Sequence, residues 1–128
     1  MRLLLDTHAF VWAVGSPSRL SDEASSAVAD PGNVLLVSAA SAWEIGTKFR
    51  LGKMPGVEPL VQDFAGMARR LGATVLPIEH EHAMLAGTLP WEHRDPFDRM
   101  LVAQAALTAS TLVSRDTGMR DPLPHVLW

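Results

Sequence analysis

The stretch LLLDTHAFVW, residues 3–12, decides the fold of this 128-residue chain. Three consecutive leucines are typical of a strand covered on both faces, because a strand with one wet face alternates apolar and polar residues. Asp6 and Thr7 end the run, and the apolar residues from Phe10 onward have helical character. The stretch therefore predicts a buried strand that runs directly into a helix, with an acid at the junction.

The same alternation of strand and helix continues along the chain. Strands separated by helices pair in parallel, because right-handed crossovers are what such spacing permits. We therefore predict an α/β fold, a three-layer α/β/α sandwich with a central parallel sheet of four or five strands, in one domain over residues 1–128. The further strands are expected at VLLV (34–37), ATVLPI (73–78), TLVS (111–114) and HVLW at the carboxyl end.

Helical segments are predicted from capping residues and apolar periodicity. Leu60, Val61, Phe64, Met67, Ala68 and Leu71 repeat with helical period, and Gly72 closes that segment. Ser38 or Ser41 can cap the helix that carries Glu44. The other helices are expected after Asp6, over 21–29, over 79–86 and over 96–109.

Composition excludes several classes of protein. Cysteine is absent, which excludes a disulfide framework, a thiolate metal site and a cysteine nucleophile. The net charge of −3 provides no overall positive field for nucleic acid, so any such contact must be local. No apolar run reaches the roughly 18 residues of a membrane span, and the first acid comes too early for a secretory signal. We expect a cytoplasmic protein without a membrane segment.

Four acids follow short apolar runs, at or near the start of helical segments: Asp6, Glu44, Asp98 and Asp116. In a parallel sheet such junctions meet at one edge, so we expect the four carboxylates to converge. Their mutual repulsion would raise their pKa values unless a cation shared the site. Carboxylate oxygens suit Mg²⁺ or Mn²⁺, so the pattern predicts a metal site for phosphoryl chemistry.

Helix capping is the alternative role for each of these acids. Asp95 before Pro96 is an N-cap with proline at the first helical position, which leaves Asp98 in the first turn. Ser41 and Glu44 match the spacing of a capping box. Asp6 and Asp116 can cap the segments that they precede. A change from carboxylate to amide separates the two roles, since an amide keeps some capping ability without the charge.

The chain also resembles a known family. LLLDTHAFVW, SAASAWEIGTKFRLGKM, LPWEHRDPFDRMLVAQA and LVSRD are similar, in the same order, to motifs of the PIN-domain ribonucleases, specifically the VapC toxins of bacterial toxin–antitoxin pairs. The resemblance covers nearly the whole chain. It implies a PIN fold and Mg²⁺-dependent endonucleolytic cleavage of RNA, tRNA or another structured RNA, with Mn²⁺ as a substitute ion.

The resemblance also assigns residues and partners. It places the catalytic, metal-binding acids at Asp6, Glu44, Asp98 and Asp116, the last at a position that some relatives fill with a neutral residue. Ser114 matches a small hydroxyl residue that faces the site. It implies a VapB-type antitoxin and a homodimer. From their positions near the acids, Lys48 and Arg99 are candidates for contacting the RNA backbone, although either can instead pair with the acids.

Two other function classes compete with this interpretation. A receiver or phosphatase would use Asp6 as a phosphoryl acceptor, but His8 occupies the second position of a D-x-D motif and no lysine follows Lys53. A catalytically silent PIN-like module would bind RNA or a partner without cutting it.

The histidines and tryptophans have simpler explanations than a second site. His80 and His82 are two residues apart on a predicted helix and so point to different faces, which disfavours a zinc site. The tryptophans fit core or interface packing, with RNA contact left open for Trp91.

Overall fold

A parallel sheet of five strands forms the centre of the computed structural model, which describes residues 1–123 and 125–128. The strand order is β3-β2-β1-β4-β5, so the first strand lies in the middle. All neighbouring strands are parallel, which confirms the predicted fold class. The strands are β1 (Arg2–Leu5), β2 (Val34–Ser38), β3 (Ala73–Leu76), β4 (Thr111–Val113) and β5 (Val126–Leu127).

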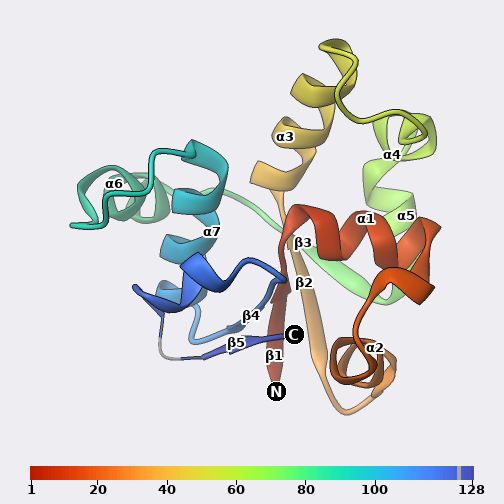
Figure 1. The fold of residues 1–128 in the computed structure, drawn as a ribbon, viewed down its shortest axis with the longest axis horizontal. Helices are drawn as coiled ribbons and strands as arrows, with labels where there is room; N and C mark the ends of the chain where they lie inside the picture. Colours follow the sequence, from red (N-terminus) through yellow and green to blue (C-terminus); the bar gives the residue numbers. More distant parts are fainter. Residues whose placement is uncertain (124) are drawn as a thin grey trace.

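Helices cover both faces of this sheet (Figure 1). They are α1 (Thr7–Gly15), α2 (Asp22–Ala29), α3 (Ala39–Arg50), α4 (Glu58–Gln62), α5 (Phe64–Leu71), α6 (His80–Thr88) and α7 (Pro96–Leu107), with short 3₁₀ turns η1 (Pro17–Arg19) and η2 (Thr117–Arg120). In Figure 1, α1, α2, α4 and α5 lie on one side of the sheet, and α6 and α7 lie on the other. Helix α3 stands at the edge where the strands end, between the two layers.

The core follows from the alternation of side chains along the strands. Leu3 and Leu5 of β1 face one apolar cluster, formed with α1, α2, α4 and α5, and Leu4 faces a second cluster, formed with α7 and η2. All three leucines are fully buried. A strand without a wet face is therefore apolar at every position, as its sequence indicates.

The prediction of one continuous helix from Leu60 to Leu71 is wrong. The segment from Leu60 to Leu71 forms two helices, α4 and α5, with Asp63 between them in a non-helical conformation (φ −149°). The Asp63 side chain accepts a hydrogen bond from the Gly66 backbone N–H at 3.0 Å and caps α5. The side-chain cap replaces backbone pairing at this position, so an unbroken apolar period does not mean an unbroken helix.

The exposure of individual side chains tests two further expectations, on the tryptophans and on the histidines of α6. Trp43 is 58% exposed, so core packing, one of the two roles expected for the tryptophans, does not apply to it, and packing at an interface stays a prediction. His82 is buried, and its Nδ1 accepts a hydrogen bond from the Glu79 backbone N–H at 3.0 Å, whereas His80 is exposed. Among the helices of the described residues, none combines the length and the apolar character that crossing a bilayer requires.

Candidate functional site: an acidic cavity where the strands end

Acids from four separate segments line one small cavity at the carboxyl edge of the sheet. The cavity has a volume of about 130 Å³. Asp6 reaches it from the end of β1, Glu44 from α3, Asp98 from α7 and Asp116 from the loop after β4. Its full lining is Asp6, Thr7, His8, Glu44, Lys48, Asp95, Asp98 and Asp116. The fold thus brings together the four acids singled out from the sequence.

Asp6 sits where the central strand passes into α1. Its backbone N–H donates to the Val113 carbonyl at 3.0 Å, which ties the end of β1 to β4. Its Oδ1 accepts from the Ala9 backbone N–H at 2.8 Å and so caps α1. Burial raises the pKa of the Asp6 carboxyl, and the hydrogen bonds from the Ser114 hydroxyl and the Ala9 N–H only partly oppose it. Capping therefore occupies one oxygen of a carboxyl group that ionises reluctantly.

Glu44 is held by side chains of two helices. The Thr7 hydroxyl donates to Glu44 Oε1 at 2.6 Å and lies 3.0 Å from the Ser41 hydroxyl oxygen. Lys48, one turn further along α3, forms an ion pair with Glu44 Oε2. The expected capping box of Ser41 with Glu44 is absent, because Ser38 caps α3 instead, by accepting from the Ala40 N–H at 2.9 Å. Glu44 is consequently oriented by the cavity rather than by the helix terminus.

Asp98 is directed to the cavity because a neighbour performs the capping. Asp95 Oδ1 accepts from the backbone N–H groups of Phe97 at 2.8 Å and Asp98 at 3.2 Å, as predicted for a cap before Pro96. The Asp98 side chain instead lies 2.7 Å from His93 Nε2. The pKa of Asp98 is raised to about 6, mainly by burial and also by the charges of Asp95 and Glu44, and the contact with His93 only partly opposes this rise.

Asp116 is the most exposed of the four acids. Its Oδ1 accepts from the Gly118 N–H at 2.9 Å, which caps η2. The Asp116 backbone N–H donates to the Ser114 hydroxyl oxygen at 3.0 Å, so Ser114 joins Asp116 to Asp6. Within residues 1–123 and 125–128, one set of acid and histidine donor atoms lies within 4.8 Å of one another, namely those of His93, Asp98 and Asp116. Asp6 and Glu44 line the cavity outside that set.

Lys48 is the cation of this cavity. Burial lowers the pKa of Lys48, but its hydrogen bond to Glu44 and the charges of Glu44, Asp95 and Asp98 outweigh that effect and leave the pKa raised. One lysine does not balance the five acids that line the cavity with it. The remaining negative potential, with oxygen donors at its centre, suits a divalent cation.

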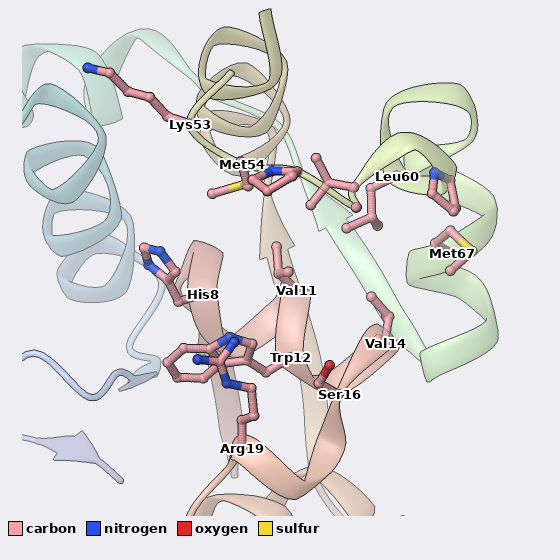
Figure 2. Close-up of a pocket in the computed structure, with 15 residues that line it drawn as sticks. His8, Val11, Trp12, Val14, Ser16, Arg19, Lys53, Met54, Leu60 and Met67 are labelled. Carbon is pink, nitrogen blue, oxygen red and sulfur yellow. The ribbon is translucent and has the colours of Figure 1, made fainter. Parts of the chain in front are cut away.

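A larger apolar cavity of about 520 Å³ lies beside the acidic one. Val11 of α1 points across it toward Met54 and Leu60, while the Trp12 ring lies beside Arg19, as Figure 2 shows. Its charged or ionisable lining residues are all basic types, His8, Arg19 and Lys53. His8 lines both cavities, so the two lie next to each other. Arg19 also stacks over the Trp12 ring, with its guanidinium carbon 5.0 Å from the ring centroid.

Comparisons with known proteins agree with this geometry. The family model of the PIN domain matches residues 3–122. The chain belongs to the PIN domain family. A segment of 61 residues is 43% identical to Ribonuclease VapC16 of Mycobacterium tuberculosis (strain ATCC 25618 / H37Rv), and the match covers 48% of this chain and 43% of that protein. The match thus spans less than half the length of this curated relative.

Solved structures share the PIN fold over nearly their whole length. The chain is similar to a VapBC2 chain from Rickettsia felis, crystallised bound to a DNA fragment from their promoter, with a TM-score of 0.69, 15% identity, and 98% of this chain and 96% of that chain covered. It is also similar to a chain of a toxin-antitoxin complex from Klebsiella pneumoniae, with a TM-score of 0.60, 19% identity, and 97% and 94% covered. At such identities the likeness concerns the fold.

The three candidate RNA contacts differ in whether their polar groups already form hydrogen bonds within the protein. The Arg99 guanidinium donates to backbone carbonyls of residues 86–93 rather than facing open solvent, so a contact with RNA would have to replace those bonds. Lys48 lines the cavity, and the Ser114 hydroxyl is engaged by the Asp6 carboxyl and the Asp116 backbone N–H. The roles of all three residues stay predictions.

Sequence reasoning did not single out two residues that shape this PIN domain site. Thr7 has no motif of its own, and its contact with Glu44 depends on a helix 37 positions away in the sequence. His93 lies in a stretch without periodicity, and only its position five residues before Asp98 connects it with an acid. The first contact leaves no local signal because it depends on how α1 and α3 meet, and the second depends on the path of the loop that leads into α7.

Proposed function

We propose that this protein is a metal-dependent endoribonuclease, a toxin of the VapC type. One observation supports this proposal above the others: Asp6, Glu44 and Asp98, from three different elements, line one cavity together with Asp116. Capping alone gives no reason for such convergence, since serine or threonine could cap each of these ends. The partial identity to a protein named a ribonuclease and the PIN family membership point in the same direction.

The donor set fits a hard divalent ion, and we propose Mg²⁺ with Mn²⁺ as a substitute. Carboxylate oxygens are the ligands these ions accept, and both ions retain water and bind phosphate oxygens. Asp98 and Asp116 would hold the ion directly, and Asp6 and Glu44 would do so directly or through water. When bound, such an ion supplies a water of lowered pKa and neutralises charge on a phosphoryl group in transit.

The protein's own residues prepare the cavity for this chemistry. Thr7 and Lys48 fix the orientation of Glu44, and Ser114 links Asp6 with Asp116. Lys48 has a raised pKa and stays cationic at neutral pH, so we propose that it also contacts a phosphate of the RNA backbone. Arg99 and Ser114 remain secondary candidates for such contacts. Attack by water would leave a 5′-phosphate and a 3′-hydroxyl.

We further propose a VapB-type antitoxin as the partner, with homodimerisation of the toxin and action in the cytoplasm. The structures that share the fold are toxin–antitoxin complexes by their names. The apolar cavity beside the site is rimmed by His8, Arg19 and Lys53, which suits a partner segment with apolar anchors and acidic residues. Because His8 belongs to both cavities, a segment seated there would lie next to the acidic cavity.

The experiment incubates the protein with structured RNA, total tRNA first, and identifies the ends of the products. The proposal expects cleavage with 5′-phosphate ends, loss of cleavage in EDTA, and recovery on adding Mn²⁺. Asp98→Asn should abolish cleavage while the circular dichroism spectrum and the folded state are kept. A 2′,3′-cyclic phosphate product, or cleavage that persists in EDTA, would overturn the proposal.

A second arm of the experiment separates catalysis from binding alone. Asp22→Asn is the matched control. Asp22 also lies in the first turn of a helix, but it is exposed and is not one of the residues that line the cavity. This variant should cleave like the wild type. A wild-type protein that binds RNA without cutting it in Mg²⁺ or Mn²⁺ would identify the catalytically silent PIN-like module instead.

A further inference from the structure

His93 occupies a position at the acidic cavity that none of the expected roles explains. It lies between α6 and α7, five residues before Asp98, and its Nε2 is 2.7 Å from Asp98 Oδ2. A donor nitrogen of His93 and carboxylate oxygens of Asp98 and Asp116 all lie within 4.8 Å of one another. Atoms at this spacing can share one cation without rearrangement of the backbone.

The ring of His93 is held in a fixed orientation. It stacks on Trp91, with ring centroids 4.4 Å apart and an interplanar angle of 11°. Trp91 in turn packs against the apolar cluster formed by α7 and β4. One face of the imidazole is therefore supported by a side chain that packs against the core. Because the ring is already restricted in rotation, less side-chain entropy is lost when it binds a ligand.

Arg99 fixes the backbone that carries this stacked pair. Its Nη1 donates to the carbonyls of Trp91 at 2.5 Å and His93 at 3.0 Å. Its remaining N–H groups donate to three more carbonyls of the same segment, Ala86 at 2.7 Å, Leu89 at 2.6 Å and Gly87 at 3.5 Å. Every N–H of the guanidinium is thus used on the segment that leads to His93. The ammonium group of lysine has fewer donors and no planar fork, and it cannot replace this set.

We propose that His93 is a nitrogen ligand of the cation, beside Asp98 and Asp116, and that Arg99 is the positioning residue that holds it there. The inference rests on the proposed function for the presence of the cation. It adds a donor type to a site that otherwise offers oxygen alone. An imidazole favours transition metals over Mg²⁺, so His93 would give the site a preference for Mn²⁺.

A different relation between His93 and Asp98 makes the opposite prediction. If the imidazole only pairs with the Asp98 carboxylate, a cation must displace it, and removing His93 would make metal binding tighter. As a ligand, His93 contributes to binding, and removing it makes metal binding weaker. The sign of the change in affinity thus distinguishes ligand from competitor.

The test measures MnCl₂ and MgCl₂ binding by isothermal titration calorimetry in the wild type, His93→Ala and His8→Ala. His8 is the matched control, since it lines the same cavity, is exposed and lies outside the close set of donors. We expect His93→Ala to weaken Mn²⁺ binding by at least about tenfold and Mg²⁺ binding by less, with His8→Ala near the wild type. Electron spin-echo spectroscopy of bound Mn²⁺ should show a directly bound nitrogen that disappears in His93→Ala and persists in His8→Ala.

Arg99→Lys tests the positioning role. It should weaken Mn²⁺ binding by roughly tenfold, as changes next to a metal ligand do, while the nitrogen signal becomes weaker or is lost. Combined with His93→Ala, it should add no further loss, because both changes remove the same ligand. Circular dichroism establishes whether each variant is folded, and His93→Gln gives a second ligand-deficient protein if Arg99→Lys does not fold.

The outcomes separate this inference from the function on which it rests. Tighter or unchanged Mn²⁺ binding in His93→Ala and His93→Gln, or a nitrogen signal that persists in them, would overturn the role of His93 and leave a metal-dependent nuclease intact. A wild-type protein that binds neither ion would overturn both.

Discussion

The environment of the Asp98 carboxyl group opposes its ionisation. Burial is the main cause that raises its pKa to about 6 in the folded protein, from the ordinary value of 3.8 for an aspartate. Because the folded-state pKa is the higher, the contribution of this group to stability is complete below about pH 3.8 and is lost as the pH rises through about 6. In metal-free protein we therefore expect Asp98→Asn, which cannot ionise, to be more stable than the wild type at pH 7.5, by about 1 kcal/mol after solvent screening.

Urea denaturation at pH 5 and pH 7.5 in the presence of EDTA checks this expectation. The stability difference between Asp98→Asn and the wild type should shrink at pH 5. Asp22→Asn serves as control and should slightly destabilise the protein at both values, since it removes a favourable charge from an exposed helix N-terminus. A loss of stability in Asp98→Asn at pH 7.5 would mean that the charged contact with His93 outweighs the cost of burial.

Thr7 carries the second prediction at the residue scale. Its hydroxyl satisfies Glu44 Oε1, which is buried, so Thr7→Val leaves that oxygen without its donor. The expected loss of stability is about 1–3 kcal/mol, measured as the free energy of unfolding in urea. Thr7→Ser keeps the hydroxyl and should retain most of the stability. A Thr7→Val variant that is less destabilised than Thr7→Ser would assign the effect to packing of the methyl group instead, because valine keeps that methyl and serine lacks it.

At this scale the sequence predicts which residues matter better than it predicts their contacts. The sequence allows two alternative roles for Asp6 and Asp116, capping and metal binding, and in the structure both residues form capping bonds and line one cavity. The roles do not exclude each other, because a capping carboxylate still has a second oxygen. The link from Thr7 to Glu44 has no such signature, since it forms only when α1 and α3 pack together.

Among the elements, the start of α5 offers a test of side-chain capping against helix propensity. A Cβ atom on Gly66 would lie 2.0 Å from Asp63 Oδ2, so Gly66→Ala must displace the capping carboxylate. We expect this variant to be less stable than the wild type, although alanine is the better helix former by about 1 kcal/mol. In an Asp63→Ala background, where no cap remains, the same substitution should be stabilising. Thermal unfolding of the four proteins measures this change of sign.

Gly46 in α3 is the matched control for that experiment. It is an exposed glycine inside a helix, and a Cβ added there meets no atom within 4 Å. Gly46→Ala should therefore stabilise the protein by up to about 1 kcal/mol through helix propensity alone. If Gly66→Ala stabilised the wild type as much as Gly46→Ala does, the Asp63 cap would contribute nothing.

Two segments show what apolar periodicity cannot predict about the helices and loops. The apolar period from Leu60 to Leu71 continues through Asp63, yet the chain breaks there, because periodicity reports which face is buried and not whether the backbone is continuous. The segment from Leu89 to Asp95 has no period at all, but it is ordered by one arginine that follows it in the sequence. Sequence patterns miss order that depends on a single side chain.

For the whole molecule, the order of the strands is what gives the site its form. The run of leucines predicts a buried β1, and the alternation of elements predicts parallel pairing, but neither determines that β1 lies between β2 and β4. That placement sets Asp6 beside the end of β4, through the bond from its N–H to the Val113 carbonyl at 3.0 Å. Acids separated by up to 110 positions in the sequence thereby meet at one cavity.

A cation bound by these acids would connect segments from the whole length of the chain, so it should stabilise the whole fold. An ion that binds only the folded state raises its stability by about 2.7 kcal/mol at a concentration one hundred times its dissociation constant. We expect the thermal unfolding midpoint to rise with MnCl₂ in the wild type and in Asp22→Asn, and to stay nearly constant in Asp98→Asn. Hydrogen exchange should slow at the Ala9 N–H, which donates to Asp6 Oδ1, and at the backbone N–H groups at the start of α7. A rise of equal size in Asp98→Asn, or in NaCl of equal ionic strength, would mean general screening of the acids rather than a bound ion, because screening does not require a shared ligand.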